Sequence, residues 1–314
     1  MAILITGASG FIGTILTKLL LEKGHRVYAV SRHPPEAADN LIPLVGDITK
    51  RNLGLIEMKP LKDITVLYHL AGVHTLHQED KNQLIHKTNV VGTEHVLDFC
   101  LKHDINHLFF ASTAYTWLVN PYGRSKIQNE DQIAAFADKH GFKATIFKPS
   151  IVLGTPENPY PGHFSRFISA IIKMHRRAEL IRRKIEGSLR FPVIEPVLRI
   201  RGQPEGKLNL TQVDQVAWGM ANIKESGTFW LTHPSPLTLE EVAEWVSEVI
   251  MVKIKFEPEF KPTPLEAAFQ KMAGSFQPYL LGHDFPSNLQ LSPPITKELI
   301  QGTVKRTVLD YPLP

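Results

Sequence analysis

The segment TGASGFIG, residues 6–13, follows a short apolar run and opens a helical pattern, and this order decides the fold. Gly7 permits a tight turn, Gly10 lets the backbone approach a pyrophosphate, and Gly13 lets helix and strand pack closely. The helix N-terminus then offers oriented N–H groups to an anion. A plain glycine-rich turn is the alternative, but position and spacing favour a dinucleotide phosphate loop. The other loop residues expected to contact the dinucleotide are Ser9, Phe11 and Ile12.

Short β-branched runs alternate with longer segments of helical periodicity through the first half of the chain. The expected strands are residues 2–6, 25–31, 41–47, 64–72, 107–113 and 143–150. Three helices are expected: one that ends at Lys23, one from about His77 to His103, and one from Tyr122 to His140. Repeated β-α-β order implies a parallel sheet with helices on both faces. The sequence therefore predicts an α/β fold: a Rossmann-type doubly wound parallel sheet with a smaller C-terminal substrate-binding lobe.

The pattern changes after Gly154, where prolines cluster in GTPENPYPG and a basic helix follows. Later strand and helix pairs are expected in 208–223 and 227–250, whereas 252–314 is punctuated by proline and has no clear assignment. We therefore expect an NAD(P)-binding domain of residues 1–154 plus about 206–232, and a substrate-binding lobe of about 155–205 plus 233–314.

The composition is that of an ordinary globular protein, with 43% hydrophobic and 21% charged residues in a chain of 314. The formal charge of +4 is too small for a nucleic-acid footprint. The single cysteine, Cys100, excludes an intramolecular disulfide and favours a reducing compartment, so we expect a cytoplasmic protein. No apolar run is long enough for a transmembrane span. The 14 histidines are scattered without convincing ligand partners, so no metal site is expected.

Polar residues at two expected strand ends bear on the choice of dinucleotide. An NAD-selective site usually carries an acidic residue there that holds the ribose 2′-hydroxyl, whereas this chain has Ser31 and Arg32 after the second strand. A guanidinium can pair with a 2′-phosphate, which favours NADP(H). NAD(H) stays open, because Arg32 can also be an ordinary surface residue. Asp47, at the end of the third strand, is placed to accept a hydrogen bond from the adenine amino group.

The stretch NPYGRSK, residues 120–126, places Tyr122 and Lys126 one helical turn apart. A free tyrosine has a pKa of about 10, so a nearby ammonium and an oxidised nicotinamide are needed to stabilise its phenolate near neutrality. In isolation a Tyr-x-x-x-Lys spacing is common, and a solvated helix face is the alternative. Downstream of a dinucleotide loop, the pair predicts proton transfer beside a nicotinamide.

Eight ordered motifs resemble those of the extended short-chain dehydrogenase/reductase superfamily, whose members include the epimerase/dehydratase-like proteins. They are TGASGFIG, GDIT, HLAG, NVVGT, ASTA, YGRSK, KPSIVLG and QVDQVA, and they span residues 1 to about 232. The resemblance implies that Tyr122 is the acid/base, that Lys126 tunes it and holds the cofactor, and that Thr113 binds the reacting carbonyl. Tyr122 follows Thr113 by only nine positions, whereas relatives commonly insert a longer loop there, so Ser112 stays open as the carbonyl partner.

The same resemblance implies cofactor contacts at the other strand ends. Asn89 in NVVGT matches the family's helix asparagine, for which a local structural role is the alternative. The remaining implied cofactor contacts are Ile48, Leu70, Ala71, Gly72, Ala111, Ser112, Lys148, Pro149 and Ile151. Relatives often dimerise through the two long helices that flank the sheet, so a homodimer is possible for this chain too.

The C-terminal half is similar to the thioester-reductase and male-sterility branch of fatty acyl reductases. The similar segments are KPSIVLGTPENPYPGHFSRF, GKLNLTQVDQVAWGMANI, GTFWLTHPSPLTLEEVAEWV and FQPYLLGHDFPSNLQL. This resemblance implies NADPH-dependent reduction of a small-molecule carbonyl, either an aldehyde or an acyl thioester bound to CoA or a carrier. Epimerisation of a nucleotide sugar by the same Tyr122 and Lys126 is the alternative. A dehydratase is disfavoured because Ala114 and Tyr115 occupy the positions where it needs an acidic pair.

Two further hypotheses concern binding. A non-catalytic dinucleotide sensor is the least favoured function, because such relatives have usually lost the tyrosine or the lysine and this chain keeps both. The basic segment IIKMHRRAELIRRK would suit a phosphopantetheine, a CoA phosphate or an acidic membrane surface, although a solvated helix face is the more frequent reason for such a run. Its basic residues are Lys173, Arg176, Arg177, Arg182, Arg183 and Lys184.

Overall fold

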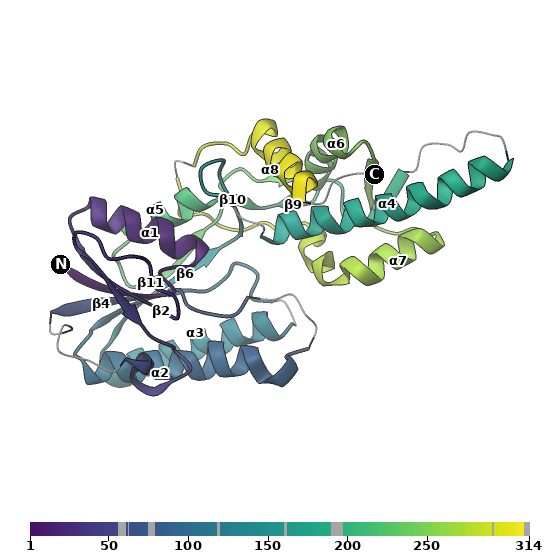
Figure 1. Cartoon of the computed structure of the whole chain (residues 1–314). Helices are drawn as coiled ribbons and strands as arrows, with labels where there is room; N and C mark the ends of the chain where they lie inside the picture. Colours follow the sequence, from purple (N-terminus) through teal and green to yellow (C-terminus); the bar gives the residue numbers. More distant parts are fainter. Residues whose placement is uncertain are drawn as a thin grey trace. The chain divides into compact units, whose positions relative to one another are not determined.

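The computed structural model in Figure 1 describes residues 1–55, 61, 63–74, 79–117, 120–159, 162–189, 197–290 and 292–310. The chain divides into two compact units, which are described separately. Unit 1 comprises residues 1–150, 213–232 and 286–290, and unit 2 comprises residues 151–212, 233–285 and 291–314. Residues 206–212, which the sequence analysis assigned to the first domain, belong to unit 2, and residues 286–290, assigned to the lobe, belong to unit 1.

Unit 1 is built on a parallel sheet, for which seven strands are described. They are β1 (Ala2–Thr6), β2 (Arg26–Ser31), β3 (Leu41–Val45), β4 (Ile64–His69), β5 (His107–Ala111), β6 (Lys143–Pro149) and β11 (Gly227–Leu231). Their order is β11-β6-β5-β4-β1-β2-β3, and every neighbouring pair is parallel. The predicted Rossmann-type doubly wound sheet is therefore confirmed.

Helices cover both faces of this sheet (Figure 1). In the figure α1 (Phe11–Glu22) and α5 (Val213–Asn222) lie together on one side, and α2 (Gly92–Lys102) and α3 (Pro121–His140) lie together on the other. The strands are consequently buried on both faces, as all five residues of β1 are. Leu4 of β1, Leu67 of β4 and Phe99 of α2 belong to one hydrophobic cluster, which fixes the layers against one another.

The helix predicted from about His77 to His103 is not continuous. Its first residues fall in 75–78, outside the described part of the chain. The described elements that follow are a 3-10 turn, η3 (Lys81–Gln83), a π-helical segment, η4 (His86–Val91), and α2. The break has a local cause, because Asn82 has a left-handed φ of 58° and the Asp80 carboxylate caps a new start by accepting the N–H groups of Ile85 and His86.

The strand order reverses at β1. Thr6, the last residue of β1, pairs with Val30 on β2 at one edge and with His69 on β4 at the other. At such a point the loops after two neighbouring strands diverge and leave a crevice outside the carboxyl ends, where dinucleotides bind in folds of this type. The loops in question begin at Gly7 and Leu70, the latter held by a hydrogen bond from its N–H to the Thr6 oxygen (3.1 Å).

Unit 2 combines helices with short two-stranded sheets. Its strands are β7 (Ile151–Leu153), β8 (Val197–Arg201), β9 (Lys207–Leu208), β10 (Leu210–Gln212), β12 (Leu237–Thr238) and β13 (Lys253–Glu257). Among the described residues, β7 pairs with β10 and β8 with β13 in parallel, and β9 pairs with β12 in antiparallel. The helices are α4 (His163–Leu189), α6 (Leu239–Ile250), α7 (Pro264–Ala273) and α8 (Lys297–Asp310), and the 3-10 helices of the chain include η1 (Arg51–Gly54) in unit 1 and η5 (Gly274–Leu281) in unit 2.

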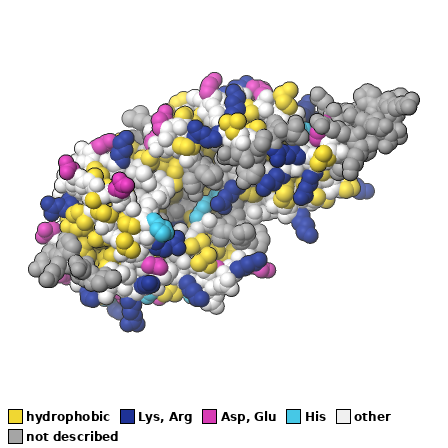
Figure 2. Space-filling model, viewed as in Figure 1, with side chains coloured by type: hydrophobic (Ala, Val, Ile, Leu, Met, Phe, Trp, Pro, Cys, Tyr) yellow, Lys and Arg dark blue, Asp and Glu magenta, His cyan; other side chains and the backbone are white. Residues whose placement is uncertain are grey.

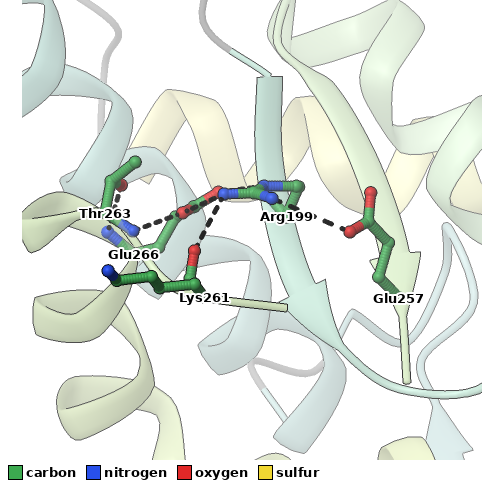
Figure 3. A network of polar contacts seen from close by, with 5 residues as sticks. All are labelled: Arg199, Glu257, Lys261, Thr263 and Glu266. Atoms are coloured by element: carbon green, nitrogen blue, oxygen red, sulfur yellow. Dashed lines mark hydrogen bonds and ion pairs between the residues drawn. The ribbon is translucent and has the colours of Figure 1, made fainter. Parts of the chain in front are cut away.

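A polar network centred on Arg199 of β8 ties three elements of unit 2 together (Figure 3). Its Nε and Nη2 donate to the two carboxylate oxygens of Glu266 on α7, each at 2.9 Å. Nη2 also donates to the Lys261 carbonyl oxygen (3.3 Å), and Nη1 lies 3.9 Å from the Glu257 carboxylate on β13. Glu266 additionally accepts the Thr263 N–H at the start of α7 (2.8 Å). The network therefore joins β8, β13 and α7.

Charged side chains are distributed over the surface. Figure 2 shows basic and acidic side chains interspersed on the visible face, with no continuous basic stripe among those described. On α4, Lys173 and Arg177 are exposed and Arg176 is partly buried, while the side chains of Arg182, Arg183 and Lys184 lie outside the described part of the structure. No helix among the described residues is both long and apolar enough to cross a bilayer.

Candidate active site

The loop after β1 is shaped for close approach of a ligand. Gly7 has a φ of +76°, and a Cβ there would lie 2.7 Å from the Ala71 backbone nitrogen. A Cβ on Gly13 would lie 2.1 Å from the Gly7 oxygen, so a side chain at either position would push the two loops or the first helical turn apart. Gly10 precedes α1 without a capping side chain, and the first turn of α1 holds no acidic residue. The first N–H groups of α1 can therefore bind an anion, as a pyrophosphate requires.

The residues after β2 and β3 form the second part of the site. The Ser31 hydroxyl oxygen is buried and has no hydrogen-bond partner among the described residues. Asp47 accepts hydrogen bonds from the N–H and the hydroxyl of Thr49 (2.9 and 2.8 Å). Burial raises the pKa of Asp47, but the Thr49 bonds and the charge of Arg32 outweigh burial and leave it below its ordinary value. Arg32 and Asp47 thus influence each other at the carboxyl ends of neighbouring strands.

Asn89 holds the loop after β4 against α3. Its side-chain oxygen accepts the Val73 N–H (2.7 Å), and its nitrogen donates to the Val73 oxygen and to the Ser125 hydroxyl, both at 3.0 Å. Ser125 in turn donates to the Tyr122 carbonyl oxygen (2.7 Å). A Cβ on Gly72 would lie 3.1 Å from the Asn89 oxygen, so a larger residue would press on this junction. Asn89 therefore has a structural function, which the sequence analysis had left as an alternative to direct cofactor contact.

Tyr122 and Lys126 lie on one face of α3, whose start is well defined. The Asn120 side chain accepts the Gly123 N–H (2.7 Å), and Pro121 occupies the first turn. Lys126 Nζ donates to the Ala111 carbonyl oxygen at 2.7 Å and lies 5.7 Å from the centroid of the Tyr122 ring. The ammonium thus connects α3 to the end of β5 while it stays beside the phenol.

Burial controls the charge of Lys126. The residue is 6% exposed, and burial lowers the pKa of its ammonium to about 8, against the opposing effect of the Glu130 carboxylate. His69 on β4 is fully buried between the hydroxyls of Thr6 (2.8 Å) and Thr93 (3.1 Å). Burial and the nearby Lys126 lower the pKa of His69 to about 3, so the imidazole is neutral near pH 7. The Lys126 ammonium therefore faces no second cation on β4.

Ser112 and Thr113, directly after β5, make different hydrogen bonds. The Ser112 hydroxyl donates to one oxygen of Glu130 in a short hydrogen bond, and the other Glu130 oxygen lies 2.8 Å from Lys148 Nζ. The Thr113 hydroxyl accepts the Tyr115 N–H at 3.2 Å, and no acceptor among the described residues takes its proton. Thr113 therefore has a proton that can be donated to a ligand oxygen, whereas the Ser112 proton is already used.

The structure brings most of the predicted residues together at one edge of unit 1. These residues end one of the strands β1 to β5, follow its carboxyl end or open the next helix: Gly7, Ser9, Gly10, Phe11, Ile12, Gly13, Ser31, Arg32, Asp47, Ile48, Leu70, Ala71, Gly72, Ala111, Ser112 and Thr113. Lys148 and Pro149 end β6, but the Lys148 ammonium is paired with Glu130 and lies 5.3 Å from the centroid of the Trp230 ring. Ile151 belongs to unit 2 as the first residue of β7.

Two residues of this region were missed by the sequence analysis. The His74 ring meets the Tyr122 ring edge-on, with 5.0 Å between the ring centroids. Glu130 joins Ser112 and Lys148, as described above. Glu130 follows Lys126 by four residues, so helical spacing was a signal that placed it on the same face. His74 had no comparable signal, because it lies in an irregular loop.

Comparison with known proteins gives both epimerases and reductases as relatives. UDP-glucose 4-epimerase of Vibrio cholerae is 29% identical over 174 residues, which are 49% of this chain and 52% of that protein. The chain named "Putative dihydroflavonol 4-reductase" from Synechocystis sp. is 25% identical over 306 residues, 85% of each chain. 2-Alkyl-3-oxoalkanoate reductase of Stenotrophomonas maltophilia is 32% identical over 121 residues, 36% of this chain and 33% of that protein. This chain therefore spans only about half of the epimerase and a third of the oxoalkanoate reductase.

Solved structures show the same fold. The UDP-glucose 4-epimerase of Thermus thermophilus in complex with NAD superposes with a TM-score of 0.64 at 20% identity, covering 98% of this chain and 99% of that one. UDP-glucuronic acid 4-epimerase from Bacillus cereus in complex with NAD gives 0.65 at 17% identity, covering 98% and 96%. The family model described as NAD dependent epimerase/dehydratase family matches residues 3–190, more than half of the chain. Because this family model covers more than half of the chain, the protein belongs to the NAD dependent epimerase/dehydratase family.

Proposed function

We propose that the protein is an NADP(H)-preferring carbonyl reductase of the extended short-chain dehydrogenase/reductase type, acting on an aldehyde or an acyl thioester. The observation that carries this proposal is the position of the buried Lys126 ammonium, which lies beside the Tyr122 ring and is anchored on the Ala111 oxygen. Thr113 lies directly after β5, the strand that ends at Ala111. Its hydroxyl donates to no acceptor among the described residues, so it can donate to the carbonyl oxygen.

The dinucleotide would lie along the carboxyl ends of the strands. The N–H groups at the start of α1 would bind its pyrophosphate at Gly10, and Gly7 and Gly13 let the loop pack closely against the neighbouring backbone. Arg32 would pair with the 2′-phosphate and Asp47 would accept from the adenine amino group. Lys126 would contact the nicotinamide ribose. NAD(H) would bind in the same way without the pairing to Arg32.

The bound nicotinamide supplies the hydride for the carbonyl carbon. Thr113 donates a hydrogen bond to the carbonyl oxygen and so orients it and stabilises the charge that develops there. Tyr122 gives its proton to that oxygen. The Lys126 ammonium then stabilises the phenolate that is left, because an opposite charge nearby favours the ionised form of the phenol.

The sequence match to one reductase-like relative supports reduction, whereas the epimerase structures that cover 98% of the chain show the fold alone. The match to the dihydroflavonol reductase-like chain extends over 85% of both proteins and thus into unit 2, whereas the match to the Vibrio cholerae epimerase covers 49% of this chain. The substrate is the part that differs between these enzymes, and the sequence analysis assigned substrate binding to residues that now lie mostly in unit 2. The sequence match to the reductase-like chain in unit 2 therefore supports a reductase.

Epimerisation of a nucleotide sugar is the second candidate, favoured by the epimerases among the relatives and by the fold neighbours. The same Tyr122 would then remove a proton as the substrate is oxidised and return it after the sugar has turned. A non-catalytic dinucleotide sensor is less favoured, since this chain keeps both the tyrosine and the lysine.

One experiment separates these functions. Purified protein is mixed with NADPH or NADH and a panel of aldehydes, acyl-CoAs and nucleotide sugars, and both cofactor absorbance and sugar composition are followed. A reductase consumes NADPH in proportion to the alcohol or aldehyde formed. An epimerase changes the sugar without net cofactor consumption, and a sensor binds the dinucleotide and does neither.

A further inference from the structure

Glu130 shares a helix face with the two residues assigned to proton transfer. It follows Lys126 by one turn and Tyr122 by two turns of α3. Its side chain is 18% exposed, and both carboxylate oxygens are engaged inside unit 1. One oxygen accepts the Ser112 hydroxyl proton, and the other lies 2.8 Å from Lys148 Nζ. A carboxylate held from the ends of β5 and β6 in this way has a fixed position relative to α3.

The charged and titratable groups around Lys126 come from several elements. On α3 they are Tyr122 and Glu130. From β4 and the loop after it come His69, which is neutral, and His74, which contacts the Tyr122 ring. From β6 comes Lys148, which is paired with Glu130. Burial lowers the pKa of Lys126, and Glu130, one helical turn further along the same face of α3, is the group whose charge opposes this effect.

We propose that Glu130 is a positioning residue, whose carboxylate, fixed by Ser112 and Lys148, keeps the Lys126 amine protonated beside Tyr122. Because Glu130 accepts the hydrogen bond of the Ser112 hydroxyl, Thr113 is left as the hydrogen-bond donor to the carbonyl oxygen. The catalytic consequence rests on the proposed function. The effect of Glu130 on the charge of Lys126 is independent of the proposed function, because it can be measured in the protein without substrate.

The direct test is an NMR titration of the full chain labelled with [13C]lysine. The Lys126 signal is assigned by its absence from a Lys126→Met protein. Glu130→Gln keeps the size of the side chain and an acceptor for Ser112 but removes the charge, so the titration midpoint of Lys126 should fall by about one pH unit. An unchanged midpoint in the folded Glu130→Gln protein would overturn the proposal.

A second variant reverses the sign of the effect. Lys148→Met removes the cation that partly neutralises Glu130, so the Lys126 midpoint should rise rather than fall. General loosening of the site would let water in and move both variants in the same direction. Shifts of the same sign in the two proteins therefore also contradict the proposal. A Lys126 midpoint that falls in Lys148→Met overturns it even if Glu130→Gln does not fold.

The matched control is Asp131→Asn, which removes an equal charge from the adjacent, exposed position of α3. Because solvent screens that carboxylate, the Lys126 midpoint should stay where it is in the parent.

If the parent reduces carbonyls, Glu130→Gln should also move the alkaline limb of its kcat/KM profile to lower pH by the same amount, with NADPH affinity preserved. If the parent reduces nothing, the proposed function fails while the titration still decides the effect of Glu130 on Lys126.

Discussion

Lys126 Nζ donates a 2.7 Å hydrogen bond to the carbonyl oxygen of Ala111, the last residue of β5. This bond places an ammonium from the helix α3 at the strand end from which Ser112 and Thr113 continue. Tyr122, Lys126 and Thr113 are thereby positioned by one short connection between a helix and a strand. The predictions below test the separate parts of this arrangement.

Tyr122→Phe should abolish proton transfer without disturbing cofactor binding. The ring and its contact with His74 remain, but no group protonates the carbonyl oxygen, so kcat should fall by about 10² to 10⁴-fold. The dissociation constant for NADPH, measured by fluorescence titration, should change little. A kcat equal to that of the parent would remove Tyr122 from the chemistry.

The rate of carbonyl reduction should depend on the protonation of Lys126. Burial lowers the pKa of this amine to about 8, so the ammonium is present below pH 8 and is lost as the pH rises through that value. The kcat/KM for reduction should accordingly fall above about pH 8. A Lys126→Met protein should have both a lower kcat and a weaker affinity for NADPH, and its residual rate should lack this alkaline limb. Persistence of the limb in that variant would assign it to another group.

Thr113 and Ser112 should differ sharply in their contribution to the rate. Thr113→Val keeps the shape of the side chain but removes the hydroxyl, which should lower kcat/KM by about 100-fold, the usual effect of losing one donor to a developing oxyanion. Ser112→Ala serves as the comparison, and its steady-state rates should stay much closer to those of the parent. The reverse order would show that Ser112 binds the carbonyl.

Arg32→Glu should change the preference between the two dinucleotides. Loss of a charge-assisted pairing, together with repulsion of the 2′-phosphate, should raise the KM for NADPH by about tenfold or more. The KM for NADH should fall or stay constant, because a carboxylate can accept from the 2′-hydroxyl. Steady-state kinetics with each cofactor measure both values. Equal changes for NADPH and NADH would place Arg32 outside the cofactor site.

The Arg199–Glu266 pair should make the stability of unit 2 depend on pH. Burial raises the pKa of Glu266, but its bonds to Arg199 and Thr263 outweigh burial and hold it below the ordinary value of 4.5. The contribution of its charge is therefore present above that ordinary value and is lost as the pH falls below it. Urea denaturation should show a lower free energy of unfolding for Glu266→Gln at pH 7, with the difference from the parent shrinking toward pH 3. Glu257→Gln, which removes a carboxylate 3.9 Å from the guanidinium, is the control and should have a smaller effect.

The parts of the fold that local sequence determines were predicted well. The apolar strands and the glycine loop carry their signal within a few residues, so the sheet and the turn from β1 into α1 followed directly from them. The interruption before α2 was missed, because it depends on the left-handed backbone of Asn82 and on capping by Asp80, which hydrophobic periodicity does not report.

Contacts between residues far apart in the sequence could not be predicted either. Glu130 is visible in the sequence four residues after Lys126, but its partners Ser112 and Lys148 come from two different strands. Residues 252–314 had no assignment because prolines punctuate them and parts of them depend on distant pairing, as β13 does on β8 and Glu266 on Arg199, 67 positions away. Only the folded chain brings these groups together.

The most direct measurement of the central claim is the fate of a hydride label. Protein is incubated with NADPH carrying deuterium at C4 of the nicotinamide and with the best substrate of an aldehyde and acyl-CoA panel, and the product is examined by mass spectrometry. The account predicts deuterium on the former carbonyl carbon, at a rate that drops by orders of magnitude in Tyr122→Phe. Undiminished transfer in Tyr122→Phe, or a product without deuterium on that carbon, would contradict it.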